Sequence, residues 1–78
     1  MPRLDFRGLK CPLPALLARR ALKRAPAGQT IEVLADDPLA PVDVPHMCRE
    51  EGIEIVEIDL QDACTRFVLR RPAPANPG

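Results

Sequence analysis

Two groups of prolines determine where helices can begin in this chain. Pro12 and Pro14 form the first group. Proline is well tolerated in the first turn of a helix because the N–H groups there have no partner within the helix. Pro26 and Gly28 then supply a stop signal. We therefore expect a helix over residues 11–25.

The second group of prolines follows a pair of aspartates. Asp37 is a good N-cap and Pro38 a good first helical residue. Two further prolines interrupt the pattern, so we expect one irregular turn, a restart near Asp43 and a helix that ends at Gly52. Capping is also the simpler interpretation of the two adjacent acids, which could otherwise be taken for a catalytic pair of carboxylates.

Four runs of residues have the composition and alternation of β-strands. They are residues 3–6, 30–35, 53–60 and 65–71, and residues 61–63 join the last two as a hairpin. The expected order is therefore β-α-β-α-β-β. Two helices on one face of a four-stranded mixed sheet bury the apolar sides of both layers, so the fold class should be α+β, a two-layer sandwich.

Size and composition exclude several classes of function. The chain has 78 residues, enough for one core, which we place in residues 1–71, with a disordered proline-rich tail over 72–78. Eleven basic residues balance eleven acidic ones, and Phe6 and Phe67 are the only aromatic residues, so stable nucleic-acid binding is not expected. Because the sequence contains neither an apolar stretch of membrane-spanning length nor a signal-peptide pattern, we expect a cytoplasmic protein whose three cysteines are thiols.

The start of the first expected helix carries Cys11, between Lys10 and Pro12. The positive end of the helix dipole favours a thiolate there. We expect the Leu13 N–H to donate to the sulfur, Arg7 and Lys10 to add positive charge, and the pKa of the thiol to be moderately lowered. An inert core cysteine is the alternative, but a loop-to-helix junction is a poor place to bury a side chain.

The position three residues after Cys11 is occupied by Pro14. A cysteine there would convert an oxidised sulfur into a disulfide, so a persulfide on Cys11 must instead be passed to another molecule. A reversible disulfide from Cys11 to Cys48 or Cys64 would indicate a redox protein, which we disfavour because these residues lie on separate elements. Cys48 should face the sheet as a small hydrophobe, and its spacing from His46 fits no zinc motif, so neither a metal nor a cofactor is expected.

A helical wheel separates residues 13–25 into two arcs. The arc expected to pack on the sheet contains Pro14, Leu17, Ala18, Ala21, Leu22 and Ala25. The opposite arc is basic and contains Arg19, Arg20, Lys23 and Arg24. Leu13 and Leu16 fall with the basic arc, either as an exposed apolar pair that docks a protein partner or as half-buried residues. The basic side chains either take part in docking or form a solvated face.

Several short motifs occur in the order and spacing of a known family. They are Leu4-Asp5, Gly8-Leu9, Cys11-Pro12-x-Pro14, Gly28, Ala35-Asp36-Asp37-Pro38, Asp43-Val44-Pro45, Cys48 and Gly52. From about Leu4 to Arg71, the chain resembles the TusA/SirA-like sulfur-carrier proteins.

The resemblance implies a two-layer α/β sandwich and a sulfurtransferase-type carrier that holds sulfane sulfur as a persulfide on Cys11. Such a carrier differs from an enzyme that turns over on its own. The donor would be a cysteine desulfurase or a rhodanese-like protein, and the acceptor a DsrE-like or other sulfur-acceptor protein. The motif at the helix start would comprise Gly8, Pro12 and Pro14. The residues expected to dock partners are Leu13, Leu16, Arg19, Arg20 and Asp37.

Members of this family serve tRNA thiolation, molybdenum-cofactor supply and sulfur oxidation. The tRNA-thiolating member has Glu between the two prolines where this chain has Leu13, which argues against that assignment. We expect the protein to act as a monomer without membrane association. The rival hypothesis is a non-catalytic interaction or regulatory module without sulfur chemistry, and it predicts that alkylation of Cys11 leaves partner binding intact.

Overall fold

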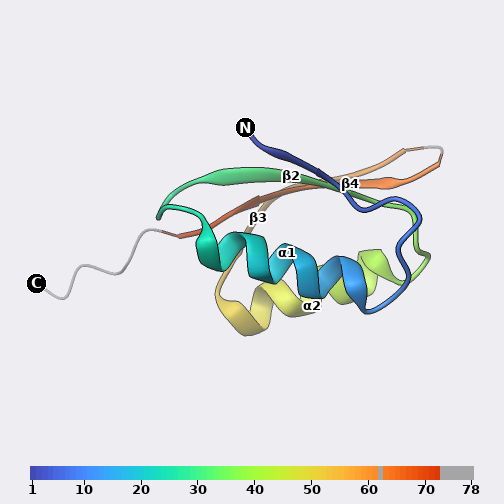
Figure 1. The fold of residues 1–78 in the computed structure, drawn as a ribbon, viewed down its shortest axis with the longest axis horizontal. Helices are drawn as coiled ribbons and strands as arrows, with labels where there is room; N and C mark the ends of the chain where they lie inside the picture. Colours follow the sequence, from blue (N-terminus) through green and yellow to red (C-terminus); the bar gives the residue numbers. More distant parts are fainter. Residues whose placement is uncertain (62, 73–78) are drawn as a thin grey trace, which may run out of the picture.

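The computed structural model describes residues 1–61 and 63–72 and confirms the expected order of elements and the fold class. The elements are β1 (Arg3–Asp5), α1 (Leu13–Arg24), β2 (Thr30–Ala35), α2 (Ala40–Glu51), β3 (Glu54–Leu60) and β4 (Thr65–Arg70). The strands form one sheet in the order β1-β2-β4-β3, in which only β1 and β2 are parallel. Both helices lie on the same side of this sheet (Figure 1).

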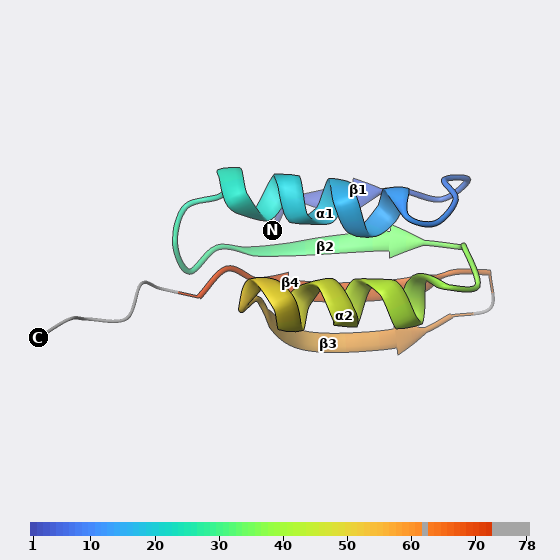
Figure 2. The ribbon, with the colours of Figure 1, turned by 90° about the horizontal axis from the view of Figure 1, so that it is seen from below.

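The helix α1 spans Leu13–Arg24, so Cys11 and Pro12 precede the helix instead of opening it. Pro14, Ala18 and Leu22 are buried as expected, and Ala15 is buried as well. Two basic residues in the last turn suit the negative end of the helix dipole. Seen from the helical side, α1 covers β1 and β2, whereas α2 covers β4 and β3 (Figure 2). The two helix N-termini therefore lie near each other, at the end of the sheet where β2 finishes.

The start of α2 differs from the expectation. The helix begins at Ala40 and continues through Asp43 without a restart, because the Asp43 N–H donates to the Leu39 carbonyl at 2.8 Å in regular helical fashion. Asp37 is not the N-cap. Its carboxylate instead accepts the Leu39 N–H at 2.7 Å and forms a turn before the helix.

The two prolines within α2 are accommodated for different reasons. Pro41 lies in the first turn, where its missing N–H had no partner. Pro45 lies inside the helix and removes one hydrogen bond, yet its ring is buried. The helix ends as expected at Gly52, whose φ of 71° is left-handed and whose N–H donates to the Cys48 carbonyl.

The core lies between the helices and the sheet and is almost wholly aliphatic. Its largest fully buried side chains are Phe67, Leu22, Leu69, Val33, Val44 and Cys48. Cys48 thus occupies the position expected of it, as a small hydrophobe facing the sheet. Because both helices pack on the same sheet, the positions of their N-terminal residues relative to each other are fixed.

Ion pairs cross the other face of the sheet. Glu32 on β2 pairs with Arg3 on β1 and with Arg66 on β4, and Arg66 also pairs with Glu57 on β3. The two arginines lower the pKa of Glu32, chiefly through hydrogen bonds to its carboxylate. This chain of charges joins all four strands, so that face has a clear structural role.

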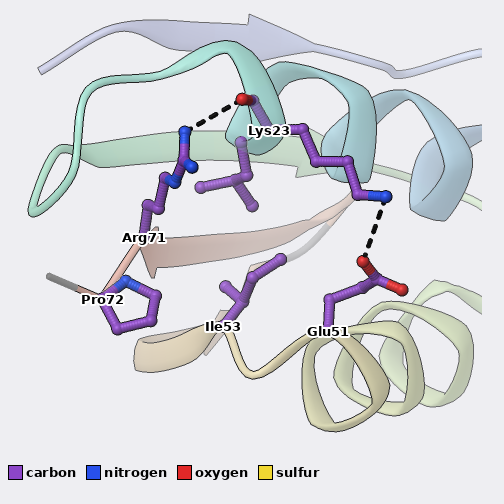
Figure 3. A pocket seen from close by; sticks show the side chains of 6 residues that line it. Lys23, Glu51, Ile53, Arg71 and Pro72 are labelled. Carbon is purple, nitrogen blue, oxygen red and sulfur yellow. Dashed lines mark hydrogen bonds and ion pairs between the residues drawn. The ribbon is translucent and has the colours of Figure 1, made fainter. Parts of the chain in front are cut away.

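At the end of α1 farthest from Cys11, a shallow pocket separates the two helices (Figure 3). Arg71, just after β4, donates to the carbonyls of Lys23 and Ala25 at 2.9 and 2.5 Å. Lys23 also pairs with Glu51 of α2 at 3.4 Å. The hydrogen bonds from Arg71 satisfy carbonyls at the C-terminal end of α1. The contacts around this pocket therefore stabilise the fold.

Two expectations from the sequence involve residues that the structure does not describe. The hairpin between β3 and β4 includes Asp62, which lies outside the described residues, and the Gln61 N–H beside it donates to the Cys64 carbonyl at 2.9 Å. Of the tail expected over 72–78, only Pro72 is described. Within residues 1–61 and 63–72, neither helix has the length and apolar character needed to cross a membrane.

Candidate functional site

Cys11 is an exposed residue in the connection between β1 and α1. Two adjacent aspartates that follow β2 hold this connection. Asp36 accepts the N–H of Gly8 at 2.9 Å, and Asp37 accepts the N–H of Cys11 at 2.8 Å. Gly8 has a φ of 88°, a left-handed conformation that favours glycine. The backbone of the cysteine is therefore anchored to the end of a central strand, while its side chain faces outward.

Asp37 is buried, with 8% of its surface exposed. One carboxylate oxygen accepts the Cys11 N–H and the other accepts the Leu39 N–H. These two backbone hydrogen bonds lower the pKa of Asp37. The sequence suggested that Asp37 caps a helix or docks a partner. The structure places its carboxylate inside, where it ties the Cys11 connection to the turn before α2.

The thiol of Cys11 donates a hydrogen bond to Oδ2 of Asp43, in the first turn of α2. This hydrogen bond, followed by desolvation and the negative charges of Asp43 and Asp37, raises the pKa of Cys11 to about 11. The expected lowering of the pKa is therefore wrong. The sulfur faces the carboxylate of Asp43, with the charge of Asp37 nearby.

The groups that were expected to stabilise a thiolate have other partners. The Leu13 N–H, predicted to donate to the sulfur, donates instead to the Lys10 carbonyl at 2.8 Å. Arg7 donates twice to Asp5, at 2.9 and 2.7 Å, and this pair lowers the pKa of Asp5 to about 2. With these donors engaged elsewhere, neither the Leu13 N–H nor the Arg7 side chain is directed at the sulfur.

A shallow groove between α1 and α2 begins at Cys11. Its polar lining is formed by Arg19 from α1 and by Asp43, His46 and Glu50 from α2, and Leu16 lies among its apolar residues. His46 pairs with Glu50 at 2.8 Å along the exposed side of α2. His46 and Cys48 therefore have different surroundings, because Cys48 is fully buried in the core.

The apolar pair expected beside Cys11 is exposed. Leu13 and Leu16 have 44% and 45% of their surface exposed, so both are exposed and not half-buried. Both line a second shallow depression on the outer side of α1, together with Arg19 and Arg20. Of these four side chains, Leu16 and Arg19 also line the groove that begins at Cys11.

Asp43 is the residue at this site whose contact with the thiol the sequence did not predict. Its signal was the short motif Asp43-Val44-Pro45, which marks a position without indicating what the carboxylate contacts. Cys11 and Asp43 are 32 residues apart, and only the packing of α1 beside α2 brings them together.

Comparisons with known proteins agree with this architecture. A family model described as sulfurtransferase TusA matches residues 3–71. A protein from Archaeoglobus fulgidus described as a putative sulfur carrier protein is 42% identical over 71 residues, covering 90% of this chain and 92% of the relative. The crystal structure of a SirA-like protein from Desulfitobacterium hafniense has a TM-score of 0.79 at 24% identity, covering 92% of this chain and 99% of that one, and this likeness shows the fold. The chain belongs to the TusA family.

Proposed function

We propose that this protein is a sulfur carrier that holds sulfane sulfur as a persulfide on Cys11. The observation that carries the proposal is an exposed thiol whose backbone is fixed by Asp37, on a chain of the TusA family. Of the other two thiols, Cys48 is buried in the core and Cys64 is half-buried next to β4. The fold thus presents Cys11 at the surface and anchors it where another protein can reach it.

Loading is a nucleophilic substitution at sulfur. The Cys11 thiolate attacks the terminal sulfur of a donor persulfide, a bond forms between Sγ and that sulfur, and the sulfur–sulfur bond of the donor breaks. The electron pair leaves with the donor thiolate, which takes up the proton lost by Cys11. Delivery repeats the same exchange, with a thiolate of the acceptor as the nucleophile. No external oxidant or reductant is consumed.

The surroundings of Cys11 support exchange with a protein partner. Pro14 stands where a resolving cysteine would be, so the loaded sulfur leaves by transfer to another molecule. Leu13 and Leu16 supply exposed apolar area, and Arg19 and Arg20 supply positive charge around it. A cysteine desulfurase or rhodanese-like donor, and a DsrE-like or other acceptor, would dock on this side of α1.

Cys11→Ser is the variant that tests the proposal, with Cys64→Ser as the matched control. Each reduced protein is incubated with a cysteine desulfurase, pyridoxal phosphate and cysteine, and its intact mass is measured. We expect the wild-type chain and Cys64→Ser to gain whole sulfur atoms that reductant removes. Cys11→Ser should keep its fold, as judged by circular dichroism, and gain none.

Two outcomes would contradict the carrier function. Equal loading of Cys11→Ser would place the sulfur on another residue. Absence of loading on the wild-type chain with several chemically different donors would favour the interaction-module hypothesis, and so would partner binding that survives alkylation of Cys11.

A further inference from the structure

The contact between Cys11 and Asp43 joins the two helix starts. Asp43 extends from the first turn of α2, and Cys11 precedes the first turn of α1. The charged or titratable groups around the thiol come from every neighbouring element: Lys10, Arg19, Asp37, Asp43, His46 and Glu50. Among these groups, only Asp43 accepts a hydrogen bond from Sγ.

Building on the proposed carrier function, we propose that Asp43 is a positioning residue that holds the empty Cys11 thiol protonated and releases the sulfur once it is loaded. The Asp43 carboxylate would then accept a hydrogen bond from Cys11 in the empty carrier and repel the persulfide in the loaded carrier. The difference rests on whether Sγ has a proton to donate.

In the empty state, the hydrogen bond stabilises the neutral thiol. Removal of its proton would place a thiolate against the carboxylate of Asp43, with the charge of Asp37 nearby. An empty carrier is therefore a poor nucleophile toward electrophiles and oxidants in solution.

In the loaded state, Sγ is bonded to a second sulfur and has no proton to donate. A persulfide is more acidic than the corresponding thiol, so its terminal sulfur is anionic at neutral pH. Asp43 and Asp37 repel that anion, which moves the terminal sulfur away from α2 and toward an acceptor. The hydrogen bond that held the empty thiol thus becomes a repulsion in the loaded carrier.

The contact also specifies the kind of donor that can load the carrier. A donor with a lysine or arginine beside its persulfide would pair with Asp43 and disrupt the hydrogen bond to Sγ. The proton of Cys11 would then pass to the departing donor thiolate, which balances the exchange described above. Donors without such a cation should load the carrier slowly.

The test is the pH dependence of Cys11 alkylation in the free protein, followed by peptide mass mapping. Wild-type Cys11 should react with a midpoint near its raised pKa of about 11. In Asp43→Asn, the midpoint should move toward the ordinary 9.0. Each unit by which the midpoint falls raises the thiolate fraction about tenfold near neutral pH, and the lower nucleophilicity of a less basic thiolate reduces the gain in rate to about threefold.

Asp59→Asn is the control, because it removes one negative charge from an aspartate on β3 whose partner is Gln61. It should leave the Cys11 profile unchanged. A wild-type midpoint at or below 9.0, or equal profiles for the wild-type chain and Asp43→Asn, would overturn the proposal. The wild-type midpoint remains decisive if Asp43→Asn does not fold.

Sulfur loading measured in parallel separates this proposal from the carrier function. If the protein takes up sulfur but Cys11 has an ordinary alkylation profile, the carrier function stands and the proposed role of Asp43 is wrong. If the alkylation profile of Cys11 is shifted but no sulfur is loaded, the contact between Cys11 and Asp43 stands and sulfur transfer is contradicted.

Discussion

At the scale of single residues, the effect of each aspartate at the site depends on the group that donates a hydrogen bond to its carboxylate. Asp37 accepts two backbone N–H groups, which lowers its own pKa and fixes two segments of chain. Asp43 accepts a thiol proton, and the effect appears as a raised pKa of Cys11. The first aspartate therefore holds the backbone, whereas the second accepts the proton of the thiol.

Asp37→Asn should remove one of the two backbone hydrogen bonds that the Asp37 carboxylate accepts and leave the other in place. Asparagine keeps one acceptor oxygen and replaces the other by an NH2 group, so either the Cys11 N–H or the Leu39 N–H loses its acceptor. We expect faster hydrogen exchange at one of these two amides and slower sulfur loading, measured by residue-resolved exchange and by intact mass.

Asp36→Asn is the neighbouring control, because Asp36 accepts only the Gly8 N–H among the side-chain hydrogen bonds of the described residues. Its effect on exchange should be confined to Gly8. Wild-type protection of both the Cys11 and Leu39 amides in Asp37→Asn would show that the anchoring role is wrong.

At the scale of elements, the two faces of α1 differ, because one packs on the sheet and the other is exposed. Small and aliphatic residues such as Ala18 and Leu22 pack on the sheet, fully buried. The outer face carries Leu13 and Leu16 exposed beside arginines. A helix whose exposed apolar residues lie in the two turns next to an exposed thiol is suited to place a partner over that thiol.

The double variant Leu13→Ser with Leu16→Ser should weaken donor binding more than it weakens the fold. Surface substitutions of this kind change stability by about 0.5 kcal/mol or less. Loss of interface anchors costs more than 1 kcal/mol each, so the Kd for the donor should rise at least about tenfold. Calorimetric titration against the donor and thermal melting check the two effects.

Val56→Ser is the control, because Val56 is 50% exposed on β3 and lies outside the proposed docking face. Its Kd for the donor should equal that of the wild-type chain. Equal binding by the double variant would remove the leucines from the docking surface.

At the scale of the whole molecule, titrating groups limit stability at both ends of the pH range. Asp5, Glu32 and Asp37 have pKa values lowered by arginines or backbone N–H groups. Their stabilisation is complete above the unfolded values of 3.8 to 4.5 and is lost as the pH falls through the folded values. Cys11 and Cys48 have raised pKa values of about 11, so their stabilisation is complete below 9.0 and is lost above it.

Stability should therefore be nearly constant between about pH 5 and pH 9 and decrease on either side. Thermal melting across the pH range checks both limits. Asp37→Asn should flatten part of the acid side, where Asp5 and Glu32 still contribute, and Cys11→Ser should flatten part of the alkaline side, where Cys48 still contributes. Melting temperatures that rise from pH 9.0 to 11 would contradict the assignment of raised thiol pKa values.

Much of the fold could be predicted from local patterns. Alternation marked β2 over Thr30–Ala35, and prolines with an apolar arc marked α1 and its buried face. Gly52 ended α2 as expected, since a left-handed residue there satisfies the last carbonyls. These features depend on residues within a few positions of one another, so the amino-acid sequence by itself determined them, along with the placement of Cys11 next to the start of α1.

The chemistry of the site depended on contacts across the chain. Cys11 reaches Asp37 and Asp43 over 26 and 32 residues, and no local pattern indicates that either carboxylate faces the cysteine. The same packing moved Asp37 from an expected cap to a buried anchor and reversed the expected shift of the Cys11 pKa. The sequence by itself determined which residue carries the thiol. Only the tertiary structure decided whether that thiol keeps its proton, because its ionisation depends on the charges that folding brings beside it.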